Sequence, residues 1–191
     1  MTLLNVLLVE DAIDNGLLEN SLKNEGVKCL RTPYNAELLT LIMEIKPDIV
    51  IFNLDTVSKK ILTDLQSLNR QLPLPVIIFS SDGHVESINQ ALKADVSAYI
   101  VGEFEPKRLA SIIQVARARF KQNQALKNEL DDVRVQLEDR KQIDRAKAIL
   151  IKTQNFTENE AYHTLRKLAM DRNITLGAMA RNVIAMAELL K

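Results

Sequence analysis

The sequence contains a single cysteine, no long apolar run and no net charge. The first two features each exclude a class of protein. The single cysteine, Cys29, cannot form an internal disulfide, and its segment VKCLRT favours a small buried side chain in a strand. No apolar run approaches the roughly 20 residues of a membrane-spanning helix. The opening MTLLNVLLVEDA carries no basic segment, so we expect a first strand there rather than a secretion signal. We therefore expect a cytoplasmic protein with no membrane contact.

The absence of net charge conceals an uneven distribution. In total, 25 basic residues balance 25 acidic ones. Residues 1–118 carry a net charge of −4, residues 119–138 are neutral, and residues 139–191 carry +4. This division predicts an acidic first domain, a linker and a basic second domain. A polyanionic partner is expected at the basic end.

The first domain, residues 1–118, alternates strands with helices. Short apolar segments typical of buried strands occur at 5–10, 27–32, 48–52, 75–80 and 97–101. Helical patterns lie near 12–25, 35–45, 57–71 and 84–94, and another starts at Pro106. This α/β order predicts a flavodoxin-like, doubly wound fold, in which helices cover both faces of a five-stranded parallel sheet.

A single long helix is predicted to follow, because nothing interrupts the helical pattern between Pro106 and Asn155. In the linker, heptad spacing places five residues on one stripe: Asn123, Leu126, Leu130, Val133 and Leu137. Such a stripe predicts a parallel two-stranded coiled coil, in which Asn123 sets the register. The alternative is a helix that packs on its own domain. The surrounding sequence is too polar for burial on more than one stripe, which favours a dimer.

The basic domain, residues 139–191, is predicted to be all-helical. The capping box TENE, from Thr157 to Glu160, opens one helix. Asn173 can end that helix and Thr175 can cap the next, which runs to about Leu190. With the end of the long helix, these two form a three-helix unit. Its inward-facing residues are expected to be Ile143, Ala146, Leu150, Ala161, Leu165, Ala169, Met179, Ala180, Val183 and Ala187.

Polar residues gather at the carboxyl edge of the predicted sheet, where doubly wound folds place their chemistry. They are Glu10, Asp11, Asn53 and Ser80, and Gly102 follows the fifth strand at the same edge. Together with LLVED, PDIVIFN, PVIIFSS and SAYIV followed by EF, they resemble the receiver domain of response regulators. In that family an acidic pair holds Mg²⁺ and an aspartate on the third strand accepts a phosphoryl group. A hydroxyl and a lysine then bind the phosphoryl oxygens.

The resemblance is incomplete where the family's reaction takes place. Glu10, Asp11 and Ser80 fit the family pattern, as does Tyr99 at the position of the switch aromatic, but Asn53 replaces the acceptor and Gly102 the lysine. An amide is not a competent nucleophile, and glycine supplies no cation. Asp55, in the following loop, is a poor substitute. We therefore expect a pseudo-receiver that is controlled by a partner protein, with no catalytic residue, metal or cofactor. The remaining acidic pair either binds Mg²⁺ weakly or is a solvated edge.

Residues 140–184, RKQIDRAKAILIKTQNFTENEAYHTLRKLAMDRNITLGAMARNVI, closely resemble the ANTAR domain of bacterial transcription antiterminators. The resemblance implies a dimer that binds RNA containing two short stem-loops and prevents formation of an adjacent terminator. With ADVSAYIV and RLASIIQVARARF, the whole chain looks most like the nitrate-assimilation antiterminators of the NasT type. Those proteins are held inactive by a nitrate-sensing protein that resembles periplasmic substrate-binding proteins. The implied partners are therefore a leader mRNA, this inhibitory sensor and a second copy of the chain.

Basic residues of the tail are the candidate RNA contacts. They are Lys141, Arg145, Lys147 and Lys152 on the first helix, and His163, Arg166 and Lys167 on the second. Such side chains bind phosphates, and arginine also binds unpaired loop bases. Without the family resemblance, the pattern favours a solvated helix surface with charge pairs. A phosphorylation-switched regulator and a DNA-binding regulator remain alternatives, although the helical joints lack a helix-turn-helix signal.

Overall fold

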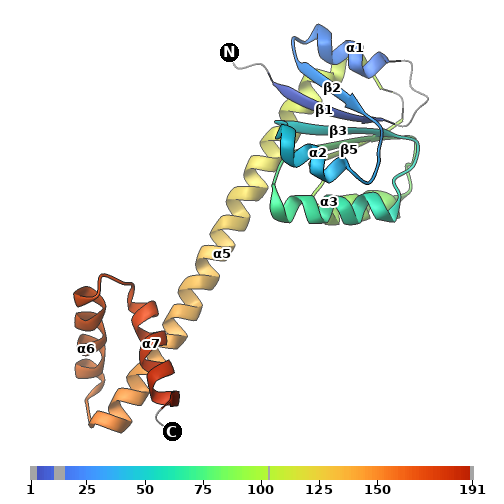
Figure 1. Ribbon diagram of the computed structural model, residues 1–191. Helices are drawn as coiled ribbons and strands as arrows, with labels where there is room; N and C mark the ends of the chain where they lie inside the picture. The colour runs from blue at the N-terminus through green and yellow to red at the C-terminus, as the bar shows by residue number, and fades with distance from the viewer. Residues whose placement is uncertain (1–3, 11–15, 103, 190–191) are drawn as a thin grey trace. The chain divides into compact units, whose positions relative to one another are not determined.

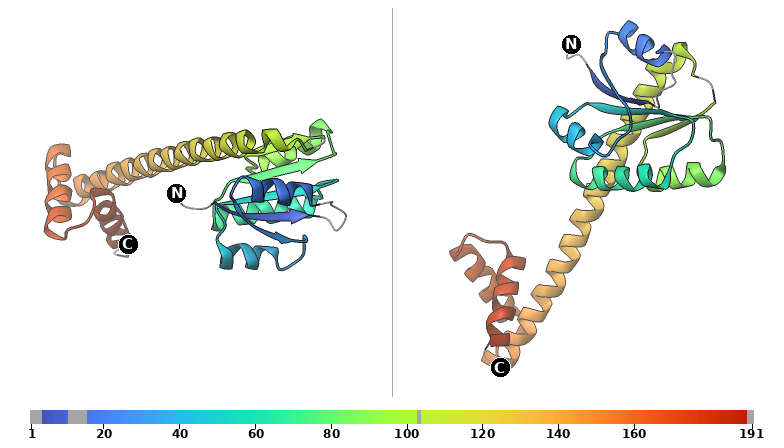
Figure 2. Two further views of the ribbon diagram at one scale, coloured as in Figure 1. Left: turned by 90° about the horizontal axis from the view of Figure 1, so that it is seen from above. Right: turned by 45° about the vertical axis from the view of Figure 1, so that its right-hand side comes forward.

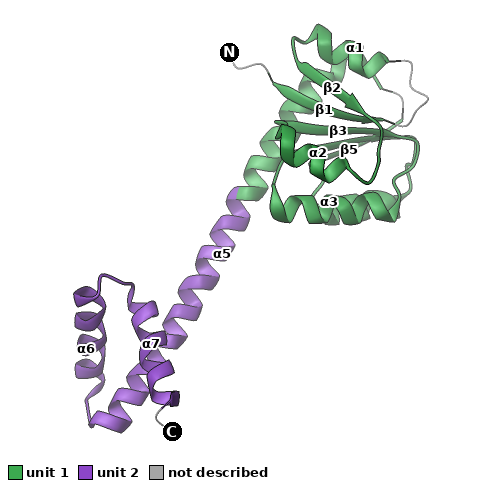
Figure 3. Ribbon diagram, viewed as in Figure 1, with its two compact units in different colours: residues 1–124 green, residues 125–191 purple. Residues whose placement is uncertain are grey.

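The computed structural model describes residues 4–10, 16–102 and 104–189. It forms two compact units, residues 1–124 and 125–191, which we call the receiver-like unit and the tail unit (Figure 3). In the part of the chain that is described, no helix is long and apolar enough to cross a membrane.

The receiver-like unit contains the predicted five-stranded parallel sheet (Figure 1). Its strands are β1 (Asn5–Glu10), β2 (Lys28–Thr32), β3 (Ile49–Leu54), β4 (Val76–Ser80) and β5 (Ala98–Val101). The order across the sheet is β2-β1-β3-β4-β5, with every neighbouring pair parallel. The predicted fold class is confirmed, and the register brings Glu10 opposite Asn53 and Leu54 opposite Ser80.

Helices cover both faces of this sheet, as the two views in Figure 2 show. They are α1 (Leu17–Asn24), α2 (Leu38–Ile45), α3 (Lys59–Gln71), α4 (Val85–Lys93), the short 3₁₀ helix η1 (Pro106–Arg108) and the start of α5 (Leu109–Gln154). Successive strand residues point to opposite faces. Val6 and Leu8 pack with α1 and α5, whereas Leu7 and Val9 pack with α2, α3 and α4. Both faces are therefore apolar, and polar chemistry is confined to the strand ends.

The long helix is confirmed, since α5 runs for 46 residues. It ends one residue before Asn155, whose φ of 59° leaves the helical region. Its first turns are buried at Leu109, Ile113 and Ala116. From residue 117 to residue 138 no residue of the helix is buried. The described chain thus leaves the heptad stripe uncovered.

The tail unit consists of the end of α5 with α6 (Glu158–Asp171) and α7 (Leu176–Leu189). The capping box is present, because the Thr157 side chain accepts from the Glu160 N–H while the Glu160 carboxylate accepts from the Thr157 N–H. Thr175 accepts from the Ala178 N–H at 3.2 Å and caps α7. The expected inward residues are buried or partly buried, and Ile184 joins them. Ile184 was not expected from the spacing.

Candidate functional site

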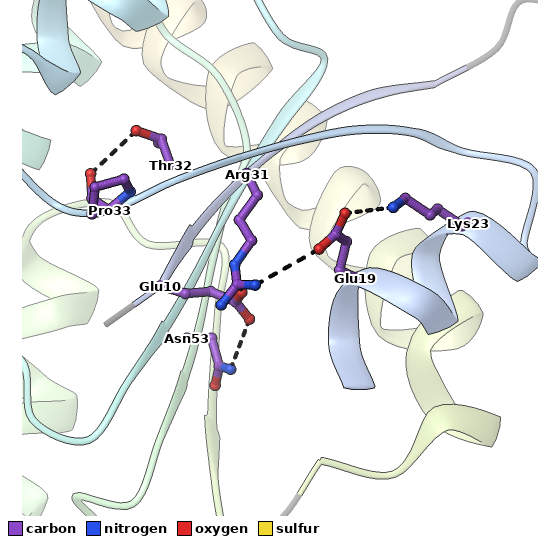
Figure 4. A network of polar contacts seen from close by, with 7 residues as sticks. All are labelled: Glu10, Glu19, Lys23, Arg31, Thr32, Pro33 and Asn53. Atoms are coloured by element: carbon purple, nitrogen blue, oxygen red, sulfur yellow. Dashed lines mark hydrogen bonds and ion pairs between the residues drawn. The ribbon is translucent and has the colours of Figure 1, made fainter. Parts of the chain in front are cut away.

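The carboxyl edge of the sheet is organised around Glu10 (Figure 4). The Glu10 side chain is only 1% exposed, and its Oε2 lies 2.6 Å from Nε of Arg31 on the neighbouring strand β2. The Asn53 amide nitrogen, at the end of β3, donates to Oε1 of Glu10 at 3.1 Å. Glu19 of α1 approaches Arg31 at 3.9 Å and is itself paired with Lys23. Asp11, the other predicted member of the acidic pair, lies outside the described residues.

The other predicted edge residues are occupied by hydrogen bonds of the chain itself. The Ser80 hydroxyl donates to the Asp55 carbonyl at 2.9 Å and accepts from the Asp82 N–H at 3.2 Å. The Tyr99 hydroxyl donates to the Asp82 carbonyl at 2.9 Å. Gly102 is exposed, with a φ of 94°. These hydrogen bonds join the loop after β3 and strand β5 to the end of β4 and the loop that follows it.

This arrangement does not support phosphoryl transfer. A nucleophile needs an available lone pair, and the lone pair of the Asn53 amide nitrogen is delocalised into its carbonyl group. The N–H of this amide donates a hydrogen bond to Glu10. The Asp55 side chain is exposed in the loop beyond β3. Within the described ranges, no group of three or more His, Cys, Asp or Glu side chains could hold a metal ion.

Sequence reasoning missed Arg31 and Glu19. Arg31 pairs opposite Leu8 in the register of β1 and β2, which brings its long side chain within reach of Glu10. Nothing in the segment VKCLRT marks this arginine, because its role depends on strand pairing. Gly102 supplies no cation after β5, whereas Arg31 brings a positive charge to Glu10 from β2.

The basic residues predicted on α5 differ in how freely they are available. Lys147 is only 16% exposed and bridges Asp144 at 2.8 Å and Glu158 at 2.9 Å. These two hydrogen bonds, that with Asp144 first, raise the pKa of Lys147. Arg145 pairs with Glu188 at 2.7 Å, but both side chains are more than half exposed. Exposed pairs of this kind contribute little stability, so Arg145 can exchange its partner while Lys147 is held.

The basic residues on α6 share one exposed face. His163, Arg166 and Lys167 are exposed, and they lie away from the buried row Ala161, Leu165 and Ala169. None of the three makes an ion pair with any residue that the structure describes. Tyr162, 38% exposed, and Met170, 70% exposed, border the same face. We call Tyr162, His163, Arg166, Lys167 and Met170 the α6 face.

Four of the predicted contacts line two hollows of the tail unit. Arg145 and Lys152 border a groove of about 640 Å³ between α5 and α7. Ile149, Val183 and Met186 are among the other residues that line it. His163 and Lys167 border a shallower hollow of about 370 Å³ next to Phe156. Lys141 stays at the surface, 3.8 Å from Glu138. Five of the seven predicted residues thus lie either at the groove between α5 and α7 or on the α6 face, whereas Lys141 and Lys147 lie at neither.

Comparison with known proteins identifies the tail. The ANTAR domain family matches residues 131–184. The tail carries an ANTAR domain. The match includes the end of α5, α6 and most of α7, and therefore every predicted RNA contact. As expected from the resemblance, the ANTAR module is present, and its match starts at residue 131, inside the linker stretch.

Two relatives extend this result. Over 181 residues the chain is 26% identical to the transcriptional regulatory protein PdtaR of Mycobacterium tuberculosis, and the match covers 94% of this chain and 88% of that protein. Over 78 residues it is 32% identical to a nitrate regulatory protein of Klebsiella oxytoca, covering 41% of this chain and 20% of that protein. The chain is thus similar to two proteins that are described as regulators.

A solved structure supports the fold of the first unit. The signal receiver domain of a modulated diguanylate cyclase from Desulfovibrio desulfuricans superposes with a TM-score of 0.55 at 22% identity, covering 64% of this chain and 99% of that chain. The likeness confirms the receiver fold of the unit that accompanies the ANTAR domain. The likeness concerns the fold alone.

Proposed function

We propose that this ANTAR-domain protein binds a leader RNA with paired stem-loops and prevents an adjacent terminator hairpin from forming. The observation that carries the proposal is the α6 face, which lies inside the matched ANTAR domain. Its Arg166 and Lys167 are exposed cations without an ion pair in the described chain. Phosphates can bind such side chains without displacing a carboxylate first.

The α6 face combines the two kinds of contact that RNA loops need. Lys167 and Arg166 supply positive charge for the backbone, and the planar guanidinium can also bind or stack on a splayed base. Tyr162 adds an aromatic ring, 6.0 Å from the His163 ring. Unpaired bases stack on exposed aromatic rings. Arg145 and Lys152, at the groove between α5 and α7, extend the basic surface and are assigned to neighbouring phosphates.

Dimerisation through α5 fits an RNA with two stem-loops. Leu126, Leu130, Val133 and Leu137 are between 50% and 57% exposed, although they repeat at heptad spacing. Asn123, at the same stripe, is also exposed. A second copy of the same helix is the natural cover for such a stripe. Two ANTAR domains held by one coiled coil would each bind one stem-loop.

We further propose that a partner protein controls the regulator through the receiver-like unit. Asn53 and Gly102 leave no acceptor and no anchoring cation at the positions used by phosphorylated receivers. The similarity to a nitrate regulatory protein favours a role in nitrate or nitrite assimilation. The expected partner is a nitrate-sensing inhibitory protein of the substrate-binding type.

Titration separates this proposal from the DNA-binding alternative. The purified chain is titrated against a leader RNA with two hairpins, the same RNA with one hairpin deleted, and duplex DNA of the same sequence. We expect the two-hairpin RNA to bind most tightly, with an affinity that falls steeply as salt rises, because phosphate contacts release counterions. Equal or tighter binding of the duplex DNA would favour the alternative.

A further inference from the structure

The receiver fold implies a bound Mg²⁺ at the carboxyl edge of the sheet, and the residues described there do not fit one. Mg²⁺ takes carboxylate oxygens and waters in octahedral geometry. Both oxygens of Glu10 already face a partner, since Oε1 accepts a hydrogen bond from the Asn53 amide and Oε2 is ion-paired with the Arg31 guanidinium at 2.6 Å. With a side chain 1% exposed, Glu10 cannot turn toward solvent to find other ligands.

We propose that Arg31 is a built-in cation that takes the place of the divalent metal at this edge. Its guanidinium neutralises the buried Glu10, as a metal ion would neutralise the acidic edge of an active receiver. The receiver-like unit therefore assembles its edge without Mg²⁺. The proposal concerns this unit alone and holds whether or not the tail binds RNA.

Electrostatics supports the exchange of a metal for an arginine. A buried carboxylate needs a close counter-charge, because burial without one is strongly unfavourable. Arg31 supplies that charge from β2, where its side chain is 37% exposed and its guanidinium also lies near Glu19. A divalent cation approaching Glu10 would meet this positive charge and be repelled. Arg31 thus neutralises the Glu10 carboxylate and keeps a metal ion away from it.

The same contacts tie three strands together. Glu10 ends β1, Arg31 lies on β2 and Asn53 lies on β3. In an active receiver, binding and loss of a phosphoryl group change the charge at this edge. In this protein the positive charge belongs to the Arg31 side chain and stays constant. A partner protein would therefore meet one fixed arrangement of the edge.

Removal of Arg31 provides the test. The variants are Arg31→Gln, Glu10→Gln with Arg31→Gln, and Arg70→Gln as a control, since Arg70 is an exposed arginine on α3. Mn²⁺ binding is measured by electron paramagnetic resonance. Thermal unfolding is recorded with MgCl₂ and with NaCl of equal ionic strength.

We expect the wild type and Arg70→Gln to bind no stoichiometric Mn²⁺ and to show the same unfolding midpoint in both salts. Arg31→Gln should unfold at a lower temperature, bind Mn²⁺ about tenfold or more above any residual binding by the wild type, and regain stability in MgCl₂. The double variant should show neither the Mn²⁺ binding nor the MgCl₂ effect, because position 10 no longer carries a negative charge. Stoichiometric Mn²⁺ binding by the wild type would overturn the proposal even if Arg31→Gln fails to fold. An Arg31→Gln protein that folds but gains no Mn²⁺ affinity would also overturn it.

Discussion

Replacement of Leu130 and Leu137 by alanine is expected to break the proposed dimer while leaving both units folded. Both side chains lie on α5 and are 50% and 55% exposed in the single chain. No residue from 117 to 138 is fully buried within the described chain. The substitutions therefore remove contacts between copies rather than contacts inside one copy. Alanine keeps the helix, because it has the highest helix propensity.

The size of the effect follows from the area that the partner helix would cover. Full burial of a leucine side chain contributes about 1.5–3 kcal/mol, so covering the exposed half contributes about 1 kcal/mol. Two leucines in each of two chains amount to about 4 kcal/mol. A loss of this size raises the dissociation constant about a thousandfold.

Sedimentation equilibrium over a range of protein concentrations measures the dissociation constant. Val135→Ala is the matched control, since Val135 is 61% exposed on the same helix but lies off the heptad stripe. The control should dimerise as the wild type does, and circular dichroism should show equal helicity for all three proteins. If the Leu130→Ala, Leu137→Ala protein retains the wild-type dissociation constant, the heptad stripe is not the interface.

Three further predictions concern the two units. Acetyl phosphate should leave intact mass and RNA affinity unchanged because position 53 is an amide; a stoichiometric adduct on Asp55 or elsewhere would contradict the pseudo-receiver interpretation. Arg166→Ala with Lys167→Ala should strongly weaken leader binding and lower the salt slope of the remaining binding by about 0.7 per lost phosphate contact. Lys147→Ala should retain most of the leader affinity, because Asp144 and Glu158 already hold this lysine. If Lys147→Ala loses more affinity than the Arg166→Ala, Lys167→Ala protein, the α6 face is not the main RNA site. Burial, with a smaller effect from Glu19, raises the pKa of the Cys29 thiol to about 11. Alkylation of Cys29 at pH 8 should therefore be about a hundredfold slower in the folded protein than in the protein unfolded in urea, and equal rates would contradict this.

Local patterns predicted much of the fold. The strands carry continuous apolar runs, and the helix ends carry their own signals at Thr157, Asn155 and Thr175, each of which acts within a few residues. The α/β order then leaves few topologies, and the observed sheet is the doubly wound one. These features could be predicted because their causes are short in range.

The site was less predictable because its charges pair across long sequence separations. Glu10 meets Arg31 only through the register of β1 and β2, and Arg145 meets Glu188 only through the packing of α7 against α5. Lys147 looked equivalent to its neighbours in the sequence, but the start of α6 brings Glu158 against it. Composition identified the basic helices. Packing decided which of their side chains remain available.

Single-round transcription in vitro tests the central claim most directly. The template carries the two-hairpin leader and its terminator upstream of a reporter segment, and the fraction of full-length transcript is measured as protein is added. We expect the wild-type protein alone, without acetyl phosphate, to raise read-through in proportion to leader binding, and the Arg166→Ala, Lys167→Ala protein to leave termination unchanged. A folded, dimeric wild-type protein that binds the leader and yet leaves termination unchanged would contradict the account.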